Sequence, residues 1–233
     1  PVFHDDQHGT AIAVLAAVIN ALIVTNRRIE DTKFVFSGAG AGGTASTKLL
    51  LEYGAKDITL VDSTGIIHRG RTDLTPVKSA MIDTTNPNNQ KGGLADALIG
   101  ADVFIGLSVA ASVTAEMVSS MAKESIVYAM ANPVPEIMPE LARAAGAGVV
   151  GTGRSDFPNQ INNSLVFPGV FRGALDARAL RITTGMKLEA AKALAGLVVE
   201  PTAENIIPWS LDTDVVPAVS QAVASAWRAE NGQ

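Results

Sequence analysis

The chain has 233 residues, of which 47% are hydrophobic and only 18% are charged. This balance excludes an intrinsically disordered protein. The net charge of −5 provides no basic surface for nucleic acid, and the absence of cysteine excludes a disulfide framework and thiolate chemistry. The longest apolar run, residues 11–24, is interrupted by Asn20 and is shorter than the roughly 20 residues of a membrane-spanning helix. We therefore expect a cytoplasmic protein that binds neither nucleic acid nor a membrane.

Strand-like and helix-like segments alternate along the first two thirds of the chain. Apolar runs predict strands at residues 33–37, 58–61, 103–106, 126–131 and 149–150. The pattern also predicts helices at residues 10–26, from 48 to a stop at Gly54, at 115–122, and over most of the chain after Leu175. This alternation indicates a parallel sheet covered on both faces. We predict one α/β domain over residues 1–233, with a doubly wound parallel sheet and a helical C-terminal extension.

A glycine-rich loop directly follows the first predicted strand. Its residues satisfy the spacing G-x-G-x-x-G: Gly38, Ala39, Gly40, Ala41, Gly42 and Gly43. Glycines allow the chain to turn sharply into a helix and allow the backbone to approach a pyrophosphate. The helix N-terminus adds free N–H groups and a partial positive charge. The loop therefore predicts a Rossmann-like dinucleotide site; a purely structural turn is the alternative.

Asp62 ends the strand that follows this loop and its helix. It lies 24 residues after Gly38, close to the spacing of a carboxylate that binds ribose hydroxyls. A carboxylate there repels a 2′-phosphate, which favours NAD over NADP. Arg69 and Arg71 follow closely and can counter that charge, so NADP stays open.

The polar segment before the long helix, residues 4–8, contains two histidines, two carboxylates and an amide. Adjacent carboxylates such as Asp5 and Asp6 suit a hard divalent cation, although two protein oxygens do not complete a site. The alternative is a solvated helix N-terminus, where aspartate is favoured. A zinc site from His4 and His8 has suitable spacing but lacks a third ligand.

Neutral amides cluster later in the chain. Asn132 follows the strand at 126–131, at the edge where open parallel sheets place their ligands. Asn162 and Asn163 follow a second amide pair, Asn159 and Gln160. Amides donate and accept hydrogen bonds and therefore suit carboxylates, carboxamides and sugar hydroxyls. The alternative for each asparagine is a turn position.

Taken together, these motifs resemble the malic enzymes, in particular the smaller bacterial type. The resemblance rests on the glycine loop and on residues 1–10 (PVFHDDQHGT), 131–136 (ANPVPE), 151–163 (GTGRSDFPNQINN) and 167–176 (FPGVFRGALD). It covers nearly the whole chain. It implies oxidative decarboxylation of L-malate to pyruvate and CO₂, with reduction of NAD or NADP and a requirement for Mg²⁺ or Mn²⁺.

The resemblance also implies roles for individual residues. The second aspartate of the pair is a metal ligand in that family, which falls on Asp6, with Asp5 beside it. Thr10 is expected near the nicotinamide, and the glycine loop and Asp62 at the pyrophosphate and adenosine ribose. Asn132 and Asn163 are expected to contact the nicotinamide side of the cofactor and malate, with Asn162 as a further substrate residue.

One part of the family pattern lies outside this sequence. Malic enzymes carry a preceding domain with a tyrosine general acid, a lysine general base and a Glu-Asp pair of metal ligands. Tyr53 and Tyr128 lie in other motifs, so we expect no catalytic acid or base in this chain. It is then the cofactor-binding domain of a homo-oligomeric malic enzyme and inactive alone. The alternatives are a non-catalytic dinucleotide-binding module and another oxidoreductase, such as an amino-acid dehydrogenase; neither accounts for the Asp5–Asp6 pair.

Overall fold

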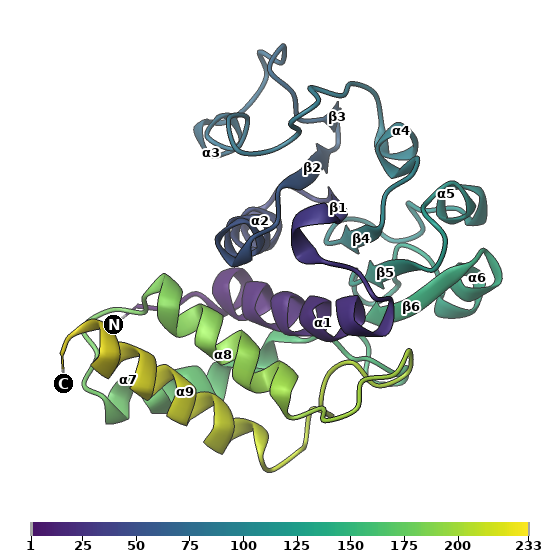
Figure 1. Cartoon of the computed structure of the whole chain (residues 1–233). Helices are drawn as coiled ribbons and strands as arrows, with labels where there is room; N and C mark the ends of the chain where they lie inside the picture. The colour runs from purple at the N-terminus through teal and green to yellow at the C-terminus, as the bar shows by residue number, and fades with distance from the viewer. Residues whose placement is uncertain (1, 233) are drawn as a thin grey trace.

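Figure 1 shows a computed structural model that describes residues 2–232 and centres on a six-stranded sheet. The spatial order of the strands is β3 (Gly65–Ile66), β2 (Asp57–Asp62), β1 (Lys33–Ser37), β4 (Val103–Gly106), β5 (Ser125–Ala129) and β6 (Ala147–Thr152). Neighbouring strands are parallel, except that β3 pairs with β2 in antiparallel fashion. This order is that of doubly wound dinucleotide-binding folds. The predicted fold class is confirmed, with a short antiparallel edge strand in addition.

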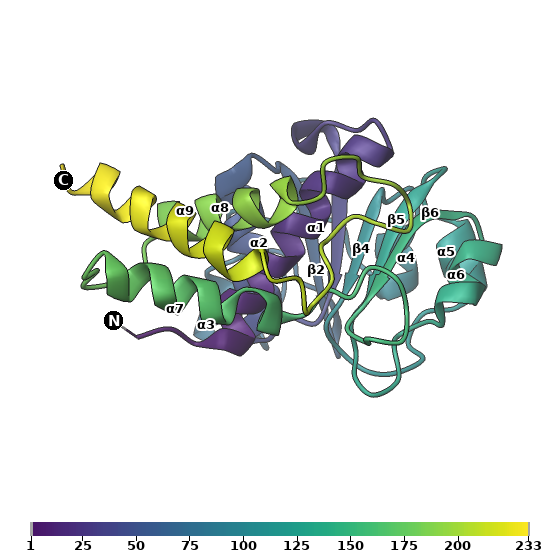
Figure 2. The same ribbon diagram turned by 90° about the horizontal axis from the view of Figure 1, so that it is seen from below.

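The strands are apolar throughout because both faces of the sheet are covered. Phe34 and Phe36 belong to one apolar core, whereas Val35 between them belongs to a second core. Figure 2 shows the corresponding layers on the two sides of the sheet. The first layer contains α1 (Thr10–Val24) and α2 (Ala41–Tyr53), and the second contains α4 (Leu94–Leu98), α5 (Ala115–Ser119) and α6 (Pro139–Ala144).

Three helices form a further layer outside α1. They are α7 (Phe167–Asp176), α8 (Thr184–Gly196) and α9 (Val215–Glu230). Helix α8 packs on α1, and α9 packs on both α7 and α8 (Figure 2). The buried Asn20 of α1 donates to the carbonyl oxygens of Ala195 and Ile206, each at 2.9 Å. The helical extension is thus joined to the first helix of the chain.

Short elements complete the chain, and some predicted boundaries change. The short elements are η1 (Asp5–Gly9), a π-helical turn, α3 (Pro76–Ser79), and the 3₁₀ turns η2 (Ile29–Asp31) and η3 (Asn163–Leu165). The helix predicted at 115–122 ends at Ser119, where the backbone bonds tighten: the Met121 N–H donates to the carbonyl of Val118, three residues back. The helical extension begins at Phe167 rather than after Leu175, with Pro168 in its first turn, where proline is favourable.

Residues 5–24 form the one continuous helix of the described chain that is long and apolar enough to cross a membrane. However, 67% of its apolar window is buried inside the protein. Every residue from Ala11 to Val18 is at most 2% exposed. Within this fold the segment is therefore the central helix of the first core.

Candidate functional site

The glycines of the loop between β1 and α2 are needed for different structural reasons. Gly38 has a φ of +111°, and a Cβ atom at Gly43 would overlap the carbonyl oxygen of Gly38. The turn itself therefore requires glycine at both positions. At Gly40, in contrast, no atom lies within 4 Å of the place a Cβ would occupy. Gly40 leaves exposed backbone beside open space, as close approach of a pyrophosphate requires.

A cavity of about 580 Å³ opens at this loop. Its lining includes Gly38, Ala39 and Gly40 together with Asp62 from the end of β2. The structure thus brings the loop and the carboxylate together, as the sequence predicted. Ala41, Gly42 and Gly43 form the first turn of α2, where free backbone N–H groups favour an anion.

The Asp62 side chain is only 6% exposed and is already surrounded by donors. Arg71 donates from Nη1 at 2.8 Å, Lys78 from Nζ at 2.6 Å and the Thr64 backbone N–H at 3.0 Å. Burial opposes ionisation, but the hydrogen bonds from Arg71 and Lys78 prevail and lower the pKa of Asp62 to about 2. Asp62 is therefore the anion of an ion cluster that contains two cations. Arg69 instead contributes its backbone N–H to Asn89.

The two carboxylates of η1 are held together by one amide. Asn163 Nδ2 donates to Oδ2 of Asp5 at 2.7 Å and to Oδ1 of Asp6 at 3.1 Å. The other oxygen of Asp5, Oδ1, is buried without a hydrogen-bond partner among the described residues. Burial, and then the charge of Asp6, raise the pKa of Asp5. This pair has an unsatisfied oxygen and excess negative charge.

The backbone that bears these carboxylates lies directly beside the glycine loop. A Cβ atom at Gly42 would lie 3.1 Å from the carbonyl oxygen of Asp6 and 3.6 Å from Cγ2 of Thr10. Thr10 also donates its hydroxyl to the Asp6 carbonyl at 3.2 Å. The predicted nicotinamide residue, the carboxylate pair and the first turn of α2 therefore form one continuous surface.

The donor set suits a hard divalent cation but does not complete a site. Residues 2–232 contain no cluster of three or more histidine, aspartate or glutamate side chains suited to a metal. The buried, unpartnered oxygen of Asp5 and the exposed carboxylate of Asp6 are the type of ligand that Mg²⁺ and Mn²⁺ prefer. The zinc alternative from His4 and His8 gains no third ligand within residues 2–232, and Nδ1 of His8 faces the ammonium group of Lys187 at 3.3 Å.

The remaining predicted residues lie at the ends of β5 and β6. Asn132 and Asn162 line a further cavity, of about 430 Å³. Arg154 organises this cavity by donating to the carbonyl of Pro133 at 2.7 Å and pairing with Asp156 at 2.6 Å. The Oδ1 atom of Asn162 accepts from the Ser164 N–H at 2.9 Å and begins η3. η3 starts at Asn163, so the chain links this cavity to the carboxylate pair.

The fully buried Glu136 joins two neighbouring strand ends. Its carboxylate accepts from the backbone N–H of Ser108 at 3.0 Å and of Ala131 at 2.9 Å. Burial raises its pKa, and the backbone donors only partly oppose that effect. Glu136 thus fixes the loop after β4 relative to Asn132.

Sequence reasoning missed Lys78 and Glu136 as parts of the site. Lys78 lies 16 residues after Asp62, in a helix of four residues that is too short for apolar periodicity to reveal. Glu136 belongs to the motif at 131–136, but sequence alone does not show that its carboxylate is turned inward. A charged residue within the otherwise apolar motif at 131–136 is the signal that was available.

Comparison with known proteins gives a consistent family. Residues 7–228 match the family model described as "Malic enzyme, NAD binding domain". The bifunctional malic/malolactic enzyme of Bacillus subtilis is 55% identical over 97% of this chain and 56% of its own length. The NAD-dependent malic enzyme of Geobacillus stearothermophilus is 52% identical over 97% of this chain and 48% of its own length. The chain thus spans about half the length of these relatives.

Two solved structures that resemble this chain belong to the same family. The NAD-dependent malic enzyme of Thermotoga maritima superimposes with a TM-score of 0.93 at 46% identity, over 96% of this chain and 59% of that chain. The malic enzyme of Pyrococcus horikoshii superimposes with a TM-score of 0.96 at 44% identity, over 99% of this chain and 56% of that chain. An NADP-dependent malic enzyme of Halomonas elongata is 45% identical over 97% of this chain and 57% of its own length, so relatives of both cofactor types are present.

Proposed function

The chain belongs to the malic enzyme family, whose NAD-binding domain it matches over residues 7–228, and from this membership we propose that it serves the oxidative decarboxylation of L-malate to pyruvate and CO₂. In this proposal the chain binds the dinucleotide, NAD or NADP, and contributes carboxylate ligands to Mg²⁺ or Mn²⁺. The whole enzyme is a cytoplasmic homo-oligomer, and its general acid and general base come from outside this chain.

One observation carries the proposal: the backbone of the segment that bears the carboxylate pair lies against the first turn of α2. The Asp6 carbonyl oxygen and the position of a Cβ at Gly42 are 3.1 Å apart, and Asn163 holds both carboxylates. A dinucleotide at the glycine loop and a divalent cation at Asp6 are therefore neighbours. Oxidation followed by loss of CO₂ from one substrate requires both groups close together.

The residues of this chain have distinct roles in that reaction. A bound dinucleotide would supply the acceptor for the hydride from C2 of malate, and a bound cation would supply the electron withdrawal that favours loss of CO₂. Gly40 leaves room for the pyrophosphate. Asn163 holds Asp5 and Asp6 in place, so the carboxylates need little reorganisation when the cation arrives. Asn132 and Asn162 offer neutral amides for the substrate carboxylates.

The surroundings of Asp62 remove the main argument for NAD alone. A 2′-phosphate would meet Asp62 together with Arg71 and Lys78 rather than a bare carboxylate, in a cluster where two cations balance the carboxylates of Asp62 and Asp73. We infer that the pocket accepts NADP as well as NAD. Lys78→Met should weaken NADP binding about tenfold, because a charge-assisted contact is lost, and should change NAD binding little.

The test begins with the dinucleotide. Calorimetric titration of the chain should give binding of NAD or NADP that Gly40→Val abolishes without changing the melting temperature, because the added side chain fills space that the pyrophosphate needs. Gly196→Val is the matched control, because Gly196 also has nothing within 4 Å of a Cβ but lies at the end of α8. Equal dinucleotide affinity in folded Gly40→Val would show that the loop is only a structural turn.

The second test addresses the reaction. The full-length enzyme should form NADH or NADPH from malate only when Mn²⁺ or Mg²⁺ is present. This chain alone should do so negligibly, because loss of general acid and base groups lowers rates by roughly 10² to 10⁴ each. Near-normal turnover by the chain alone would contradict the division of labour proposed above.

A further inference from the structure

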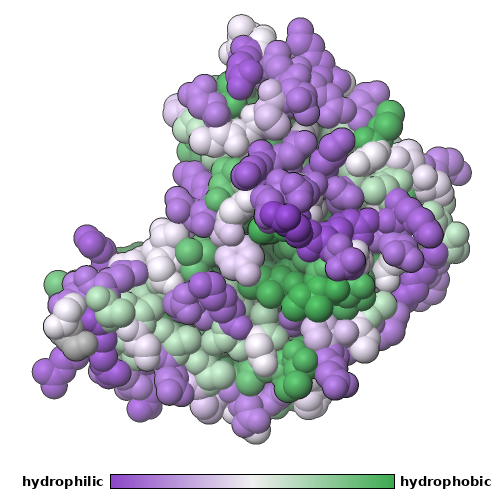
Figure 3. Space-filling view, viewed as in Figure 1, coloured by the Kyte–Doolittle hydropathy of each residue, from purple (hydrophilic) through white to green (hydrophobic). Residues whose placement is uncertain are grey.

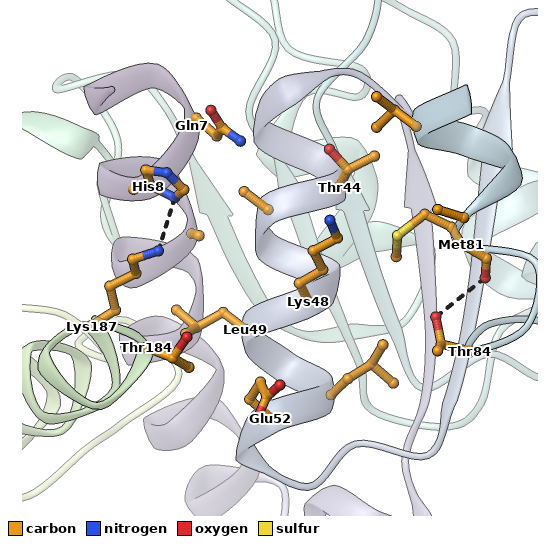
Figure 4. A pocket seen from close by; sticks show the side chains of 15 residues that line it. Gln7, His8, Thr44, Lys48, Leu49, Glu52, Met81, Thr84, Thr184 and Lys187 are labelled. Atoms are coloured by element: carbon orange, nitrogen blue, oxygen red, sulfur yellow. Dashed lines mark hydrogen bonds between the residues drawn. The ribbon is translucent and has the colours of Figure 1, made fainter. Parts of the chain in front are cut away.

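A second large cavity, of about 610 Å³, lies on the α2 side of the molecule (Figure 4). Its walls come from η1 and the start of α1, from α2, from α8 and from residues 77–84. None of its lining residues also lines the 580 Å³ cavity at the glycine loop. Its volume falls in the range of small-molecule sites.

Two lysines that line this cavity, Lys48 and Lys187, have no carboxylate partner in the described part of the chain. Lys187, which is half-buried, has its Nζ 3.3 Å from Nδ1 of His8, and Figure 4 shows Lys48 projecting from α2 into the same space. An ammonium group has no acceptor, so Lys187 donates to His8. Within residues 2–232, neither lysine has a carboxylate oxygen within 4 Å.

Among residues 2–232, Lys187 is the one half-buried lysine without a carboxylate partner, because the other lysines without such a partner are exposed. Lys192, one and a half turns along α8 from Lys187, pairs with Glu189 at 2.8 Å. Glu52 is the single acidic residue lining the cavity. It lies at the lower end of α2 in Figure 4, away from the Lys187–His8 pair. Burial of an ammonium group without a counter-ion is unfavourable, and it lowers the pKa of Lys187.

The rest of the lining is mixed in a way that suits an organic molecule. Met81 and Leu49 are buried side chains that present apolar surface, and the exposed Val77 stands at the edge. Gln7 lies next to His8, across α2 from Met81 (Figure 4). Sites for small molecules combine apolar walls with a few polar groups in this manner.

We propose that this cavity is a second binding site, for a small organic anion. A carboxylate or phosphate group contacts Lys187 and Lys48, and an apolar part of the ligand lies against Leu49 and Met81. The site is separate from the dinucleotide pocket, and the inference does not depend on the proposed reaction. The cavity does adjoin the proposed metal ligands, because Gln7 and His8 follow Asp6 directly in η1.

The experiment is calorimetric titration of the chain with three probes: inorganic pyrophosphate, succinate and 8-anilinonaphthalene-1-sulfonate. The first two separate phosphate from carboxylate recognition, and the third adds a large apolar part to an anion. Lys187→Met should lower the affinity for the probe about tenfold or more, because a charge-assisted contact is lost. Lys192→Met, on the same helix but already paired with Glu189, should change the affinity less than twofold.

Two further variants make the result decisive. Gly40→Val blocks the glycine loop, so a probe that still binds to it and still depends on Lys187 occupies the cavity. Lys48→Met repeats the test from α2 if Lys187→Met fails to fold. The proposal is overturned if no probe binds at millimolar concentration, or if Lys187→Met and Lys48→Met weaken binding no more than Lys192→Met.

Discussion

Asp62 and the Asp5–Asp6 pair are carboxylates beside the same glycine loop, yet their surroundings are opposite. Asp62 has two cationic partners and a backbone N–H, and its pKa is lowered to about 2. Asp5 has a like charge next to it, one amide donor and a buried oxygen without a partner. The first carboxylate is satisfied within the chain, whereas Asp5 keeps an oxygen that has no partner within residues 2–232 and that a divalent cation would contact in the proposed function.

The difference separates a structural role from a binding role. A carboxylate already saturated by donors stabilises the fold and shapes the pocket around it. Two carboxylates brought together without a cation destabilise the free protein, and cation binding relieves that repulsion. Position next to a glycine loop therefore does not by itself show the role of an aspartate. The hydrogen-bond and ionic partners of its carboxylate show that role.

The largest expected effect concerns Asp6 in the full-length enzyme. Asp6→Asn should lower Mn²⁺ affinity and Mn²⁺-dependent turnover by more than about 100-fold, since substitutions even outside the ligand shell change metal affinity 10- to 100-fold. The affinity of this chain for dinucleotide should not change. Metal titration beside dinucleotide titration provides the measurement, and the exposed Asp83→Asn is the control. Unchanged metal affinity would make Asp6 a helix-start residue only.

The next effect concerns stability. Asp62→Asn should lower the free energy of unfolding by about 2 kcal/mol, from the pKa displacement of Asp62 at 1.36 kcal/mol per unit. Asp73 pairs with the same Arg71 but is 48% exposed, so Asp73→Asn should change stability much less than Asp62→Asn does. Urea unfolding of both variants at neutral pH tests the contrast. Equal losses would show that Asp62 is not the anchor of the cluster.

The same contribution should depend on pH with a defined sign. The pKa of Asp62 is lower in the folded protein than its ordinary value of 3.8, so its stabilisation is complete above that value. It is lost as the pH falls from about 4 toward 2. The stability difference between the wild type and Asp62→Asn should therefore shrink over this interval. A difference that stays constant down to pH 2 would contradict the ion cluster.

The smallest expected effect has the opposite sign. The pKa of Asp5 is raised in the folded protein, so its ionised form disfavours folding at neutral pH. Asp5→Asn should then slightly raise the melting temperature of the metal-free chain at pH 7, but not below the ordinary aspartate pKa. Mn²⁺ should raise the melting temperature of the wild type more than that of Asp5→Asn. A lower melting temperature for metal-free Asp5→Asn would contradict the repulsion.

The sequence was informative where local pattern determines structure. The strands at 33–37 and 103–106 have the predicted bounds, because short apolar runs that end in turns leave few alternatives. The position of Asp62 followed from spacing alone. Its partners did not, because Arg71 and Lys78 reach it across the turn at β3 and the short helix α3. Likewise, no local pattern shows that Asn163 reaches Asp5, which is 158 residues away in sequence.

The two hydrogen bonds from Asn20 have a consequence for how the chain is made. Helix α1 is synthesised long before its partners, because the carbonyl groups that Asn20 binds belong to Ala195 and Ile206, 175 and 186 residues later. Its apolar surface therefore cannot be covered by α8 until most of the chain has been translated. During that interval α1 is a strongly apolar nascent helix, of the kind that aggregates or is held by chaperones. Contacts of such long sequence separation also slow folding, so the first core is completed only after the segment that contains Ala195 and Ile206 has been made.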